Sequence, residues 1–598
     1  MTRRWVWGLV AGWIALMAAT LSAEPTPSIE PSELRPGQTG YGLTVFSGTE
    51  PERFEVEIIG VLPDFRTDLD YVIARLSGHG LEESGVAAGM SGSPVYIDGR
   101  LVGAVAFSWN FTRGAIAGIT PISGMRRLLE LPEVGPLPSG AMPRGEAPDL
   151  ATLVKRDFPR TALRDEWLRW LGANRDDAQG AVQWHVAGFQ PEARRLLDEV
   201  LGTVGSIGPG GMTSRSTDAT SSDGATGELV AGGAVAMPLV WGDLSMAATG
   251  TVTEVDGDSI LAIGHPVFSL GEMRLPMATA SVVMIVPNLA SSFKLSTVGE
   301  VIGAFDVDRV TGTRGRVGLE APTLPMSVEV HGTSVQRYAM QVAHAGPLVP
   351  LLVASGAFGT FQTASHDMGG DQGLDFEARI GIDGHDDLVL RQSYGGDAAV
   401  IDAMTDLLTF LNYLIFNELE SVRLTGVDIV ATQYARPRVH DLVAARPSRL
   451  VVRPGDEVDV VLDLRAWRGE IEQRTVTVTI PPTASEGLLP VLIGDGTSMD
   501  AVALELDRPA PRTFEQSLDY LRSLAARDSL VAFAAMRASG WSLDGTVLPA
   551  LPGSVRGVFD NGRATALSLA RLGEQRWPSS FPIEGVVRVD FDVRRGLQ

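Results

Sequence analysis

The chain has 598 residues, no cysteine, and a formal net charge of −23 at neutral pH. This length exceeds what one hydrophobic core supports, so two to four domains are expected. The lack of cysteine excludes disulfides, thiol catalysis and thiolate metal sites. The acidic balance argues against a nucleic-acid partner, because it repels phosphate backbones, and is typical of a soluble surface.

The first 23 residues have the pattern of an export signal. Arg3 and Arg4 precede an uncharged run over residues 5–21, and Leu21-Ser22-Ala23 offers a small-residue cleavage site. An uncleaved membrane anchor is the alternative, although the run is short against the roughly 17–25 residues of a spanning helix. We expect a signal peptide over residues 1–23 and an exported protein that is periplasmic or associated with the cell envelope.

Residues 24–130 read as short strands with no helix between them. Period-two alternation of apolar residues predicts strands at 43–46, 54–62, 71–76 and 115–122. Such a run is typical of a β-barrel or sandwich.

A glycine-flanked serine interrupts these strands. Residues 89–94 read Gly-Met-Ser-Gly-Ser-Pro, and the hairpin that follows turns at Asp98-Gly99. A serine in such a tight turn can expose its hydroxyl, while the neighbouring N–H groups point at one spot, as an oxyanion hole requires.

The middle of the chain changes character twice. Residues 131–230 predict a Pro/Gly-rich linker and a helical insertion, ending in a polar excursion over residues 203–228. Strands resume over 231–345, where residues 261–266 read Leu-Ala-Ile-Gly-His-Pro.

The remainder divides into three predicted regions. Residues 346–445 form an accessory region with a helix over 402–418. Residues 446–510 read as a β-sandwich, and residues 511–598 as an α/β region. Thr513 and Gln516 make a capping box for a helix in this last region.

Three segments resemble the SpoIVB peptidase family of serine peptidases. They are the serine hexapeptide with its hairpin, residues 251–266, and residues 298–305. The resemblance implies a trypsin-like β-barrel fold and an acyl-enzyme mechanism. The family has its histidine segment first, whereas here the serine comes first. We therefore expect a mainly β protein with some α structure, in which one barrel is assembled from two segments in permuted order around the insertion.

The resemblance assigns roles to two side chains and two main-chain N–H groups. Ser91 is the expected nucleophile and His265 the general base, with the N–H groups of Gly89 and Ser91 as the oxyanion hole. Ser93 and His79 are weaker alternatives for the nucleophile and the base.

The third catalytic group is less defined by the sequence. The family has an acid shortly before the nucleophile, but residues 76–81 contain no aspartate. Asp70 is the nearest substitute, Asp256 and Asp258 are rivals near His265, and a dyad without a carboxylate is also compatible with the chemistry.

These residues predict an exported serine endopeptidase that cleaves protein or peptide substrates and needs no cofactor or metal. Residues 116–122 are candidates for the substrate pocket or for core packing, with Trp109 and Phe111 beside them. The cluster at Asp383, His385, Asp386 and Asp387 reads as a solvated turn rather than a metal site. The alternative function is a non-catalytic envelope protein that keeps the barrel as a binding scaffold.

Overall fold

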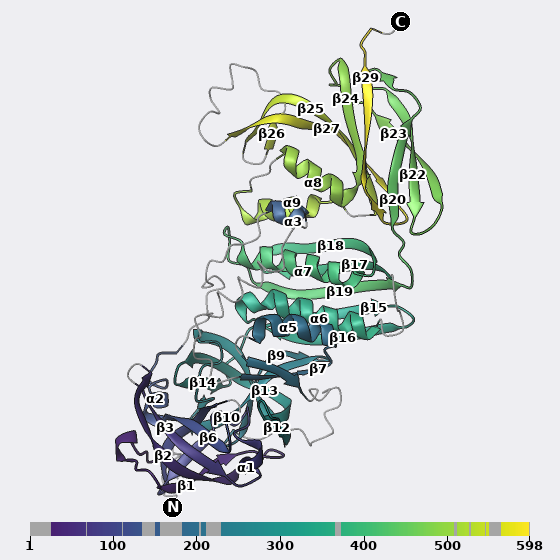
Figure 1. Ribbon diagram of the computed structural model, residues 1–598. Helices are drawn as coiled ribbons and strands as arrows, with labels where there is room; N and C mark the ends of the chain where they lie inside the picture. Colours follow the sequence, from purple (N-terminus) through teal and green to yellow (C-terminus); the bar gives the residue numbers. More distant parts are fainter. Residues whose placement is uncertain are drawn as a thin grey trace, which may run out of the picture.

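The protein is described by a computed structural model, in which the chain runs from a barrel at one end to a β-sandwich at the other (Figure 1). The described residues are 26–66, 69–109, 112–133, 150–155, 182–202, 205–210, 229–364, 372–507, 511–525, 528–543, 546–548 and 564–596. The predicted signal peptide lies outside them, as does most of the excursion over 203–228.

The first six strands close into a barrel in the order β1-β2-β3-β6-β5-β4. Alternate residues of these strands, among them Val56, Ile58, Ala74 and Leu76, fill its interior, as the period-two pattern predicts. Short helices flank the barrel. The elements are η1 (Pro31–Glu33), β1 (Thr39–Thr44), β2 (Glu52–Arg66), β3 (Leu69–Ser77), α1 (Leu81–Ser84), β4 (Pro94–Ile97), β5 (Arg100–Ser108), β6 (Ala115–Pro121) and α2 (Ile122–Arg126).

A second ring of strands forms further along the chain. Its order is β9-β12-β13-β14-β11-β10, and the pairing of β9 with β10 closes it. The strands are β9 (Ala234–Gly242), β10 (Ser245–Asp256), β11 (Ser259–Ala262), β12 (Gly271–Val286), β13 (Phe293–Arg309) and β14 (Gly312–Val317). The structure thus has two rings where the sequence predicts a single barrel, because each segment carries enough strands to close by itself.

The sheet of the second ring continues on both sides. Beyond β10 lie β7 (Val182–Ala187) and β8 (Gly205–Pro209), so the predicted helical insertion also contributes strands. Its helices are α3 (Leu150–Lys155) and α5 (Pro191–Leu201). Beyond β9 follow β16 (Val335–Ala343), β15 (Thr323–His331), β19 (Leu424–Tyr434), β17 (Gln372–Ile382) and β18 (His385–Gly396).

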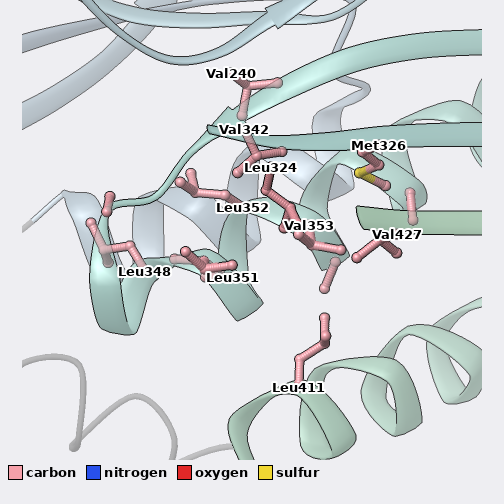
Figure 2. Close-up of a cluster of buried hydrophobic side chains, with 14 of the residues drawn as sticks. Val240, Leu324, Met326, Val342, Leu348, Leu351, Leu352, Val353, Leu411 and Val427 are labelled. Atoms are coloured by element: carbon pink, nitrogen blue, oxygen red, sulfur yellow. The ribbon is translucent and has the colours of Figure 1, made fainter. Parts of the chain in front are cut away.

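Two apolar helices cover this extension of the sheet. They are α6 (Val349–Ala364), which follows η2 (Gly346–Leu348), and α7 (Ala399–Phe416), which confirms the helix predicted over 402–418. Figure 2 shows Leu351, Leu352 and Val353 of α6 between sheet residues such as Val342 and Leu411 of α7. In the described ranges α7 is the one helix long and apolar enough to span a bilayer, but 72% of its apolar window is buried, as in the core of a soluble protein.

The C-terminal part packs two sheets around one core. The sheets take strands from both sides of the predicted boundary at residue 510. Their elements are β20 (His440–Pro447), β21 (Val451–Val452), β22 (Glu457–Ala466), β23 (Ile471–Thr479), β24 (Gly487–Asp495), β25 (Ser529–Leu543), β26 (Thr546–Leu548), β27 (Ala564–Pro578), β28 (Ile583–Glu584) and β29 (Val586–Val593), with α8 (Gly496–Asp507) and α9 (Phe514–Ser523) alongside. The Thr513 side chain caps α9 as predicted, accepting the Gln516 N–H.

Candidate active site

Ser91 lies in the tight turn between α1 and β4. Gly89 and Gly92 on either side have φ angles of +94° and +97°, which favour glycine because they avoid a Cβ clash. A Cβ on Gly92 would lie 1.9 Å from the Thr251 carbonyl oxygen and 2.6 Å from the Ile263 nitrogen. Glycine at position 92 is therefore required for the second ring to approach the turn.

Hydrogen bonds hold the turn on the first barrel. The Gly92 N–H donates to the Val105 carbonyl at 2.7 Å, and the Val105 N–H donates to the Ser93 carbonyl at 2.9 Å. Met90 is fully buried in the barrel core. The turn is thus anchored at both ends of Ser91, while the serine itself faces the second ring.

His265 follows β11 and is held against the first barrel. The Thr120 hydroxyl of β6 donates to the Gly264 carbonyl at 2.6 Å. A Cβ on Gly264 would lie 3.1 Å from the Ala104 side chain, so this backbone approaches closely. Ile263 has a φ of +51°, an unusual value for a β-branched residue, and the His265 N–H donates back to its carbonyl. This tight turn sets the direction of the imidazole.

Two more hydrogen bonds join the rings beside the serine. The Thr251 N–H of β10 donates to the Ser91 carbonyl at 2.8 Å, and the Thr253 hydroxyl donates to the Gly92 carbonyl at 2.7 Å. β10 therefore runs alongside the nucleophile turn and is hydrogen-bonded to it at two consecutive carbonyls.

These contacts bring Ser91 and His265 together. Nε2 of His265 lies 3.0 Å from Oγ of Ser91, although 174 positions separate the two residues. Nδ1 lies 2.8 Å from the Pro266 carbonyl oxygen, which can only accept a hydrogen bond. The proton of a neutral imidazole is thereby placed on Nδ1, so the lone pair of Nε2 faces the serine hydroxyl.

The predicted oxyanion hole has the required N–H groups. Within the described part of the chain, neither the Gly89 nor the Ser91 N–H donates to a protein acceptor. Both belong to the turn that presents Ser91, so both stay candidates for the predicted oxyanion hole.

Asp70 lies in the β2–β3 hairpin, where its Oδ1 accepts the Asp64 N–H at 3.0 Å. Asp256 and Asp258 lie at the turn between β10 and β11, whereas His265 follows the opposite end of β11. The Pro266 carbonyl oxygen lies 2.8 Å from Nδ1 of His265, the nitrogen that a third catalytic group would orient.

The other sequence alternatives have different partners. Nε2 of His79 lies 2.9 Å from the Arg53 carbonyl, and the ring stacks on Phe46. Ser93 is fully buried, and its hydroxyl donates to the Met90 carbonyl at 2.6 Å. Ser93 thus stabilises the nucleophile turn from inside the protein.

Sequence reasoning missed Asp308, which is fully buried behind His265. Its carboxylate accepts the N–H groups of Val267 at 2.8 Å and Phe268 at 2.7 Å, and lies 3.3 Å from that of Leu270. Burial raises the pKa of Asp308 above its ordinary value, although these backbone donors act in the opposite direction. Asp308 fixes the loop that follows the histidine, and the two aspartates at alternate positions among apolar residues, Asp306 and Asp308, were the available signal.

Sequence reasoning also missed Lys294 on β13. It is fully buried, and its ammonium donates to Thr44 Oγ1 at 2.7 Å and to Thr251 Oγ1 at 3.1 Å. The chain has 49 basic residues, but only Lys155 and Lys294 are lysines. A lysine in an arginine-rich chain was the available signal. A buried lysine can lose its proton and become a neutral amine, whereas an arginine stays charged.

The predicted pocket residues are only partly described. Ala115 and Ala117 of β6 are buried in the core of the first barrel. This part of the strand therefore packs in the core, which was the alternative to a substrate pocket. The Trp109 ring lies 5.4 Å from that of Phe107, and Phe111 lies outside the described residues. In the described ranges, no group of three or more histidine, aspartate or glutamate side chains is placed to hold a metal.

Residues 9–114 match the family model of SpoIVB peptidase S55. This SpoIVB peptidase match confirms the resemblance inferred from the serine hexapeptide and indicates a serine peptidase. It covers less than a fifth of the chain, contains Ser91, and ends before His265. Neither a curated protein nor a solved structure matches the chain.

Proposed function

We propose that this chain is a serine endopeptidase in which Ser91 is the nucleophile and His265 the general base. The observation that carries the proposal is the 3.0 Å separation of Ser91 Oγ and His265 Nε2 across two six-stranded rings. A serine hydroxyl becomes nucleophilic when a base accepts its proton within such a distance. Two packed rings with the catalytic pair between them also fit the trypsin-like architecture that the resemblance implies.

The first half-reaction follows from this geometry. Ser91 Oγ attacks the carbonyl carbon of a peptide bond while Nε2 of His265 takes the hydroxyl proton. The carbonyl oxygen becomes an oxyanion, which the N–H groups of Gly89 and Ser91 stabilise. The imidazolium then gives the proton to the leaving amine, and the C–N bond breaks to leave an acyl-enzyme on Ser91.

The second half-reaction reverses these roles. Nε2 accepts a proton from water, the resulting hydroxide attacks the acyl carbon, and the proton returns to Ser91 as the acid product leaves. Throughout, the Nδ1–H of His265 donates to the Pro266 carbonyl. We propose that this main-chain contact sets the tautomer and the orientation of the imidazole, which is the task of the third group in a catalytic triad.

The proposed substrates are proteins or peptides outside the cytoplasm. This part of the proposal depends on the predicted export signal and on the resemblance to an endopeptidase family. The sheet extension and the C-terminal sandwich would then serve as accessory parts for substrate capture or attachment to the envelope.

A fluorophosphonate probe tests the catalytic pair, because it reacts covalently with activated serines. We expect the wild type to be labelled, Ser91→Ala to be unlabelled, and His265→Ala to be labelled on the order of 10⁴-fold more slowly. His79→Ala is the matched control, since this histidine belongs to the same barrel but bonds to the Arg53 carbonyl.

The control should be labelled at the wild-type rate. A folded wild type that stays unlabelled between pH 6 and 9 would refute the peptidase and favour the non-catalytic scaffold. Equal labelling of wild type and Ser91→Ala would place the reactive serine elsewhere.

A further inference from the structure

Three successive peptide groups form the turn that carries the proposed oxyanion hole. The peptide between Ala88 and Gly89 carries one N–H of the hole, and the peptide between Met90 and Ser91 carries the other. In a trans peptide the C=O and N–H point in opposite directions, and the described chain has no cis peptide bond. Whatever holds the carbonyls of these peptides inward therefore holds the N–H groups outward.

All three carbonyls have a bonding partner. The middle peptide, between Gly89 and Met90, carries neither N–H of the hole, because its own N–H donates to the Ala87 carbonyl at 3.0 Å, so its contacts fix the link between the two peptides that do. The Ala88 carbonyl accepts the main-chain N–H of Lys294 at 2.9 Å. The Gly89 carbonyl accepts the Thr251 hydroxyl at 2.8 Å, and the Met90 carbonyl accepts the Ser93 hydroxyl at 2.6 Å. One donor comes from the first barrel and two come from the second ring.

The side chain of Lys294 donates to two of the threonine hydroxyls around this turn. Its ammonium donates to Thr251 Oγ1, which in turn donates to the Gly89 carbonyl. It also donates to Thr44 Oγ1, which lies 3.0 Å from the Ser93 hydroxyl. The stem of the lysine packs beneath Gly89, where a Cβ would lie 3.1 Å from it.

We propose that Lys294 is a positioning residue for the oxyanion hole, which it holds open through its main-chain N–H and through the hydroxyls of Thr251 and Thr44. This inference depends on the proposed peptidase function and extends it. It makes the hole a product of both rings, because β13 and β10 from the second ring orient a turn that belongs to the first.

The surroundings of Lys294 agree with a structural task. The groups that face its nitrogen are the hydroxyls of Thr44 on β1 and Thr251 on β10, and both are neutral. Burial lowers the pKa of Lys294 to about 7, with no charged side chain contributing. Burying an amine that faces two hydroxyls and no carboxylate costs free energy, which packing alone does not justify. A role in positioning the adjacent serine turn explains why the lysine is there.

The experiment separates the binding of a fluorophosphonate probe from its reaction. The phosphoryl oxygen enters the oxyanion hole as Ser91 attacks, so the hole affects the maximal labelling rate constant. We expect Lys294→Met to lower this constant about 10²-fold and to leave the half-saturating probe concentration nearly unchanged. Lys155→Met is the matched control, because it removes the other lysine, on α3, and should have no effect.

A second pair of variants tests the Thr251 hydroxyl while Lys294 stays in place. Thr251→Val keeps the shape but removes the hydroxyl, and we expect about a tenfold lower rate constant. Thr251→Ser restores the hydroxyl and should restore most of the rate, which a purely structural role would not require. This pair decides the question if Lys294→Met fails to fold.

The outcomes distinguish the two proposals. If the wild type is labelled and both Lys294→Met and Thr251→Val react at the wild-type rate constant, the role of Lys294 is wrong while the peptidase stands. If the folded wild type is not labelled at all, the peptidase is wrong and the oxyanion hole with it. With only two lysines in the chain, ¹³C NMR of the lysine ε-carbons also reports the titration of Lys294 without any activity, Lys155→Met providing the assignment.

Discussion

The two rings bury very different side chains. In the described part of the first barrel, the buried polar side chains are Thr44, Ser93 and Thr120, and none is charged. The second ring buries charged or ionisable groups at several positions: Glu254, His265, Lys294, Asp306, Asp308 and Arg314. In the described residues, the barrel that carries the nucleophile thus buries no charged side chain, whereas the ring that carries the base buries several, some of which contact the first barrel and the segment after it.

This difference separates two tasks. An apolar interior packs well without directional bonds, so the first barrel is a scaffold that presents the nucleophile turn. Buried charges are stable only with specific partners, so they fix particular backbone segments in place. Arg314 donates to the carbonyls of Leu128 and Leu131 after α2, Asp308 holds the histidine loop, and Lys294 supports the serine turn. The second ring therefore positions parts of both rings.

Separating the rings should have the largest effect. In Gly92→Ala the new Cβ would overlap the Thr251 carbonyl, so we expect complete loss of fluorophosphonate labelling and a stability loss of about 3 kcal/mol or more. Gly99→Ala is the matched control, because its φ is also positive at +74° but nothing lies within 4 Å of its Cβ. That variant should cost about 1 kcal/mol and keep its labelling. Equal behaviour of the two variants would show that the close approach at Gly92 does not matter.

The next largest effect should come from Asp308→Asn. One oxygen that now accepts an N–H becomes an amide NH₂, which leaves a buried donor without a partner and costs about 1–3 kcal/mol. Because the affected loop begins next to His265, we also expect labelling to slow by about tenfold or more. Labelling kinetics and urea unfolding measure the two effects, with the exposed Asp258→Asn as control. Unchanged kinetics in Asp308→Asn would confine this carboxylate to a purely structural role.

Lys294→Met should raise stability and lower activity. Burial holds the pKa of Lys294 near 7 in the folded state, below the ordinary value of lysine, so unfolding takes up a proton between these two values. The lysine therefore destabilises the fold most below pH 7, and less as the pH rises. We expect Lys294→Met to raise the melting temperature at pH 6 and to raise it less at pH 9, while labelling slows. A melting temperature that falls equally at both pH values would contradict the buried-amine interpretation.

The smallest effect should come from an ion pair at the edge of the sheet extension. His385 lies between Glu420 at 2.9 Å and Glu515 at 2.7 Å, and the hydrogen bonds to these carboxylates raise the pKa of His385. A raised pKa means that its stabilising contribution is complete below the pKa of the unfolded state and is lost as the pH rises through the folded value. We expect His385→Gln to lower the melting temperature by about 1–2 °C at pH 5.5 and not at pH 9. The same shift at both pH values would show that packing, not charge, is responsible.

Local pattern predicted much of this protein. The period-two runs placed the strands of the first barrel, because one side of each strand faces an apolar core. The glycines around Ser91 predicted a tight turn, and Gly89 and Gly92 have the positive φ angles that such a turn favours. The pattern over residues 402–418 predicted α7, and Thr513 predicted the start of α9. Each of these features depends on neighbours in the sequence.

Closure and pairing depended on distant contacts. The sequence suggested one barrel, but the pairing of β9 with β10 closes a second ring, and period-two patterns do not say which strands become neighbours. The same holds for Asp70, a carboxylate chosen for its nearness in sequence, whose bond is to Asp64. A main-chain carbonyl such as that of Pro266 carries no sequence signal at all, because every residue has one.

By itself, the amino-acid sequence determined where a reactive serine could be exposed and which histidine had a matching context. Only the tertiary structure decided that these two side chains face each other at 3.0 Å, and that Lys294 and Asp308 lie buried behind them. The physical reason is that backbone conformation and alternation are local properties, whereas burial of a charge and the meeting of two loops are properties of the whole packed chain.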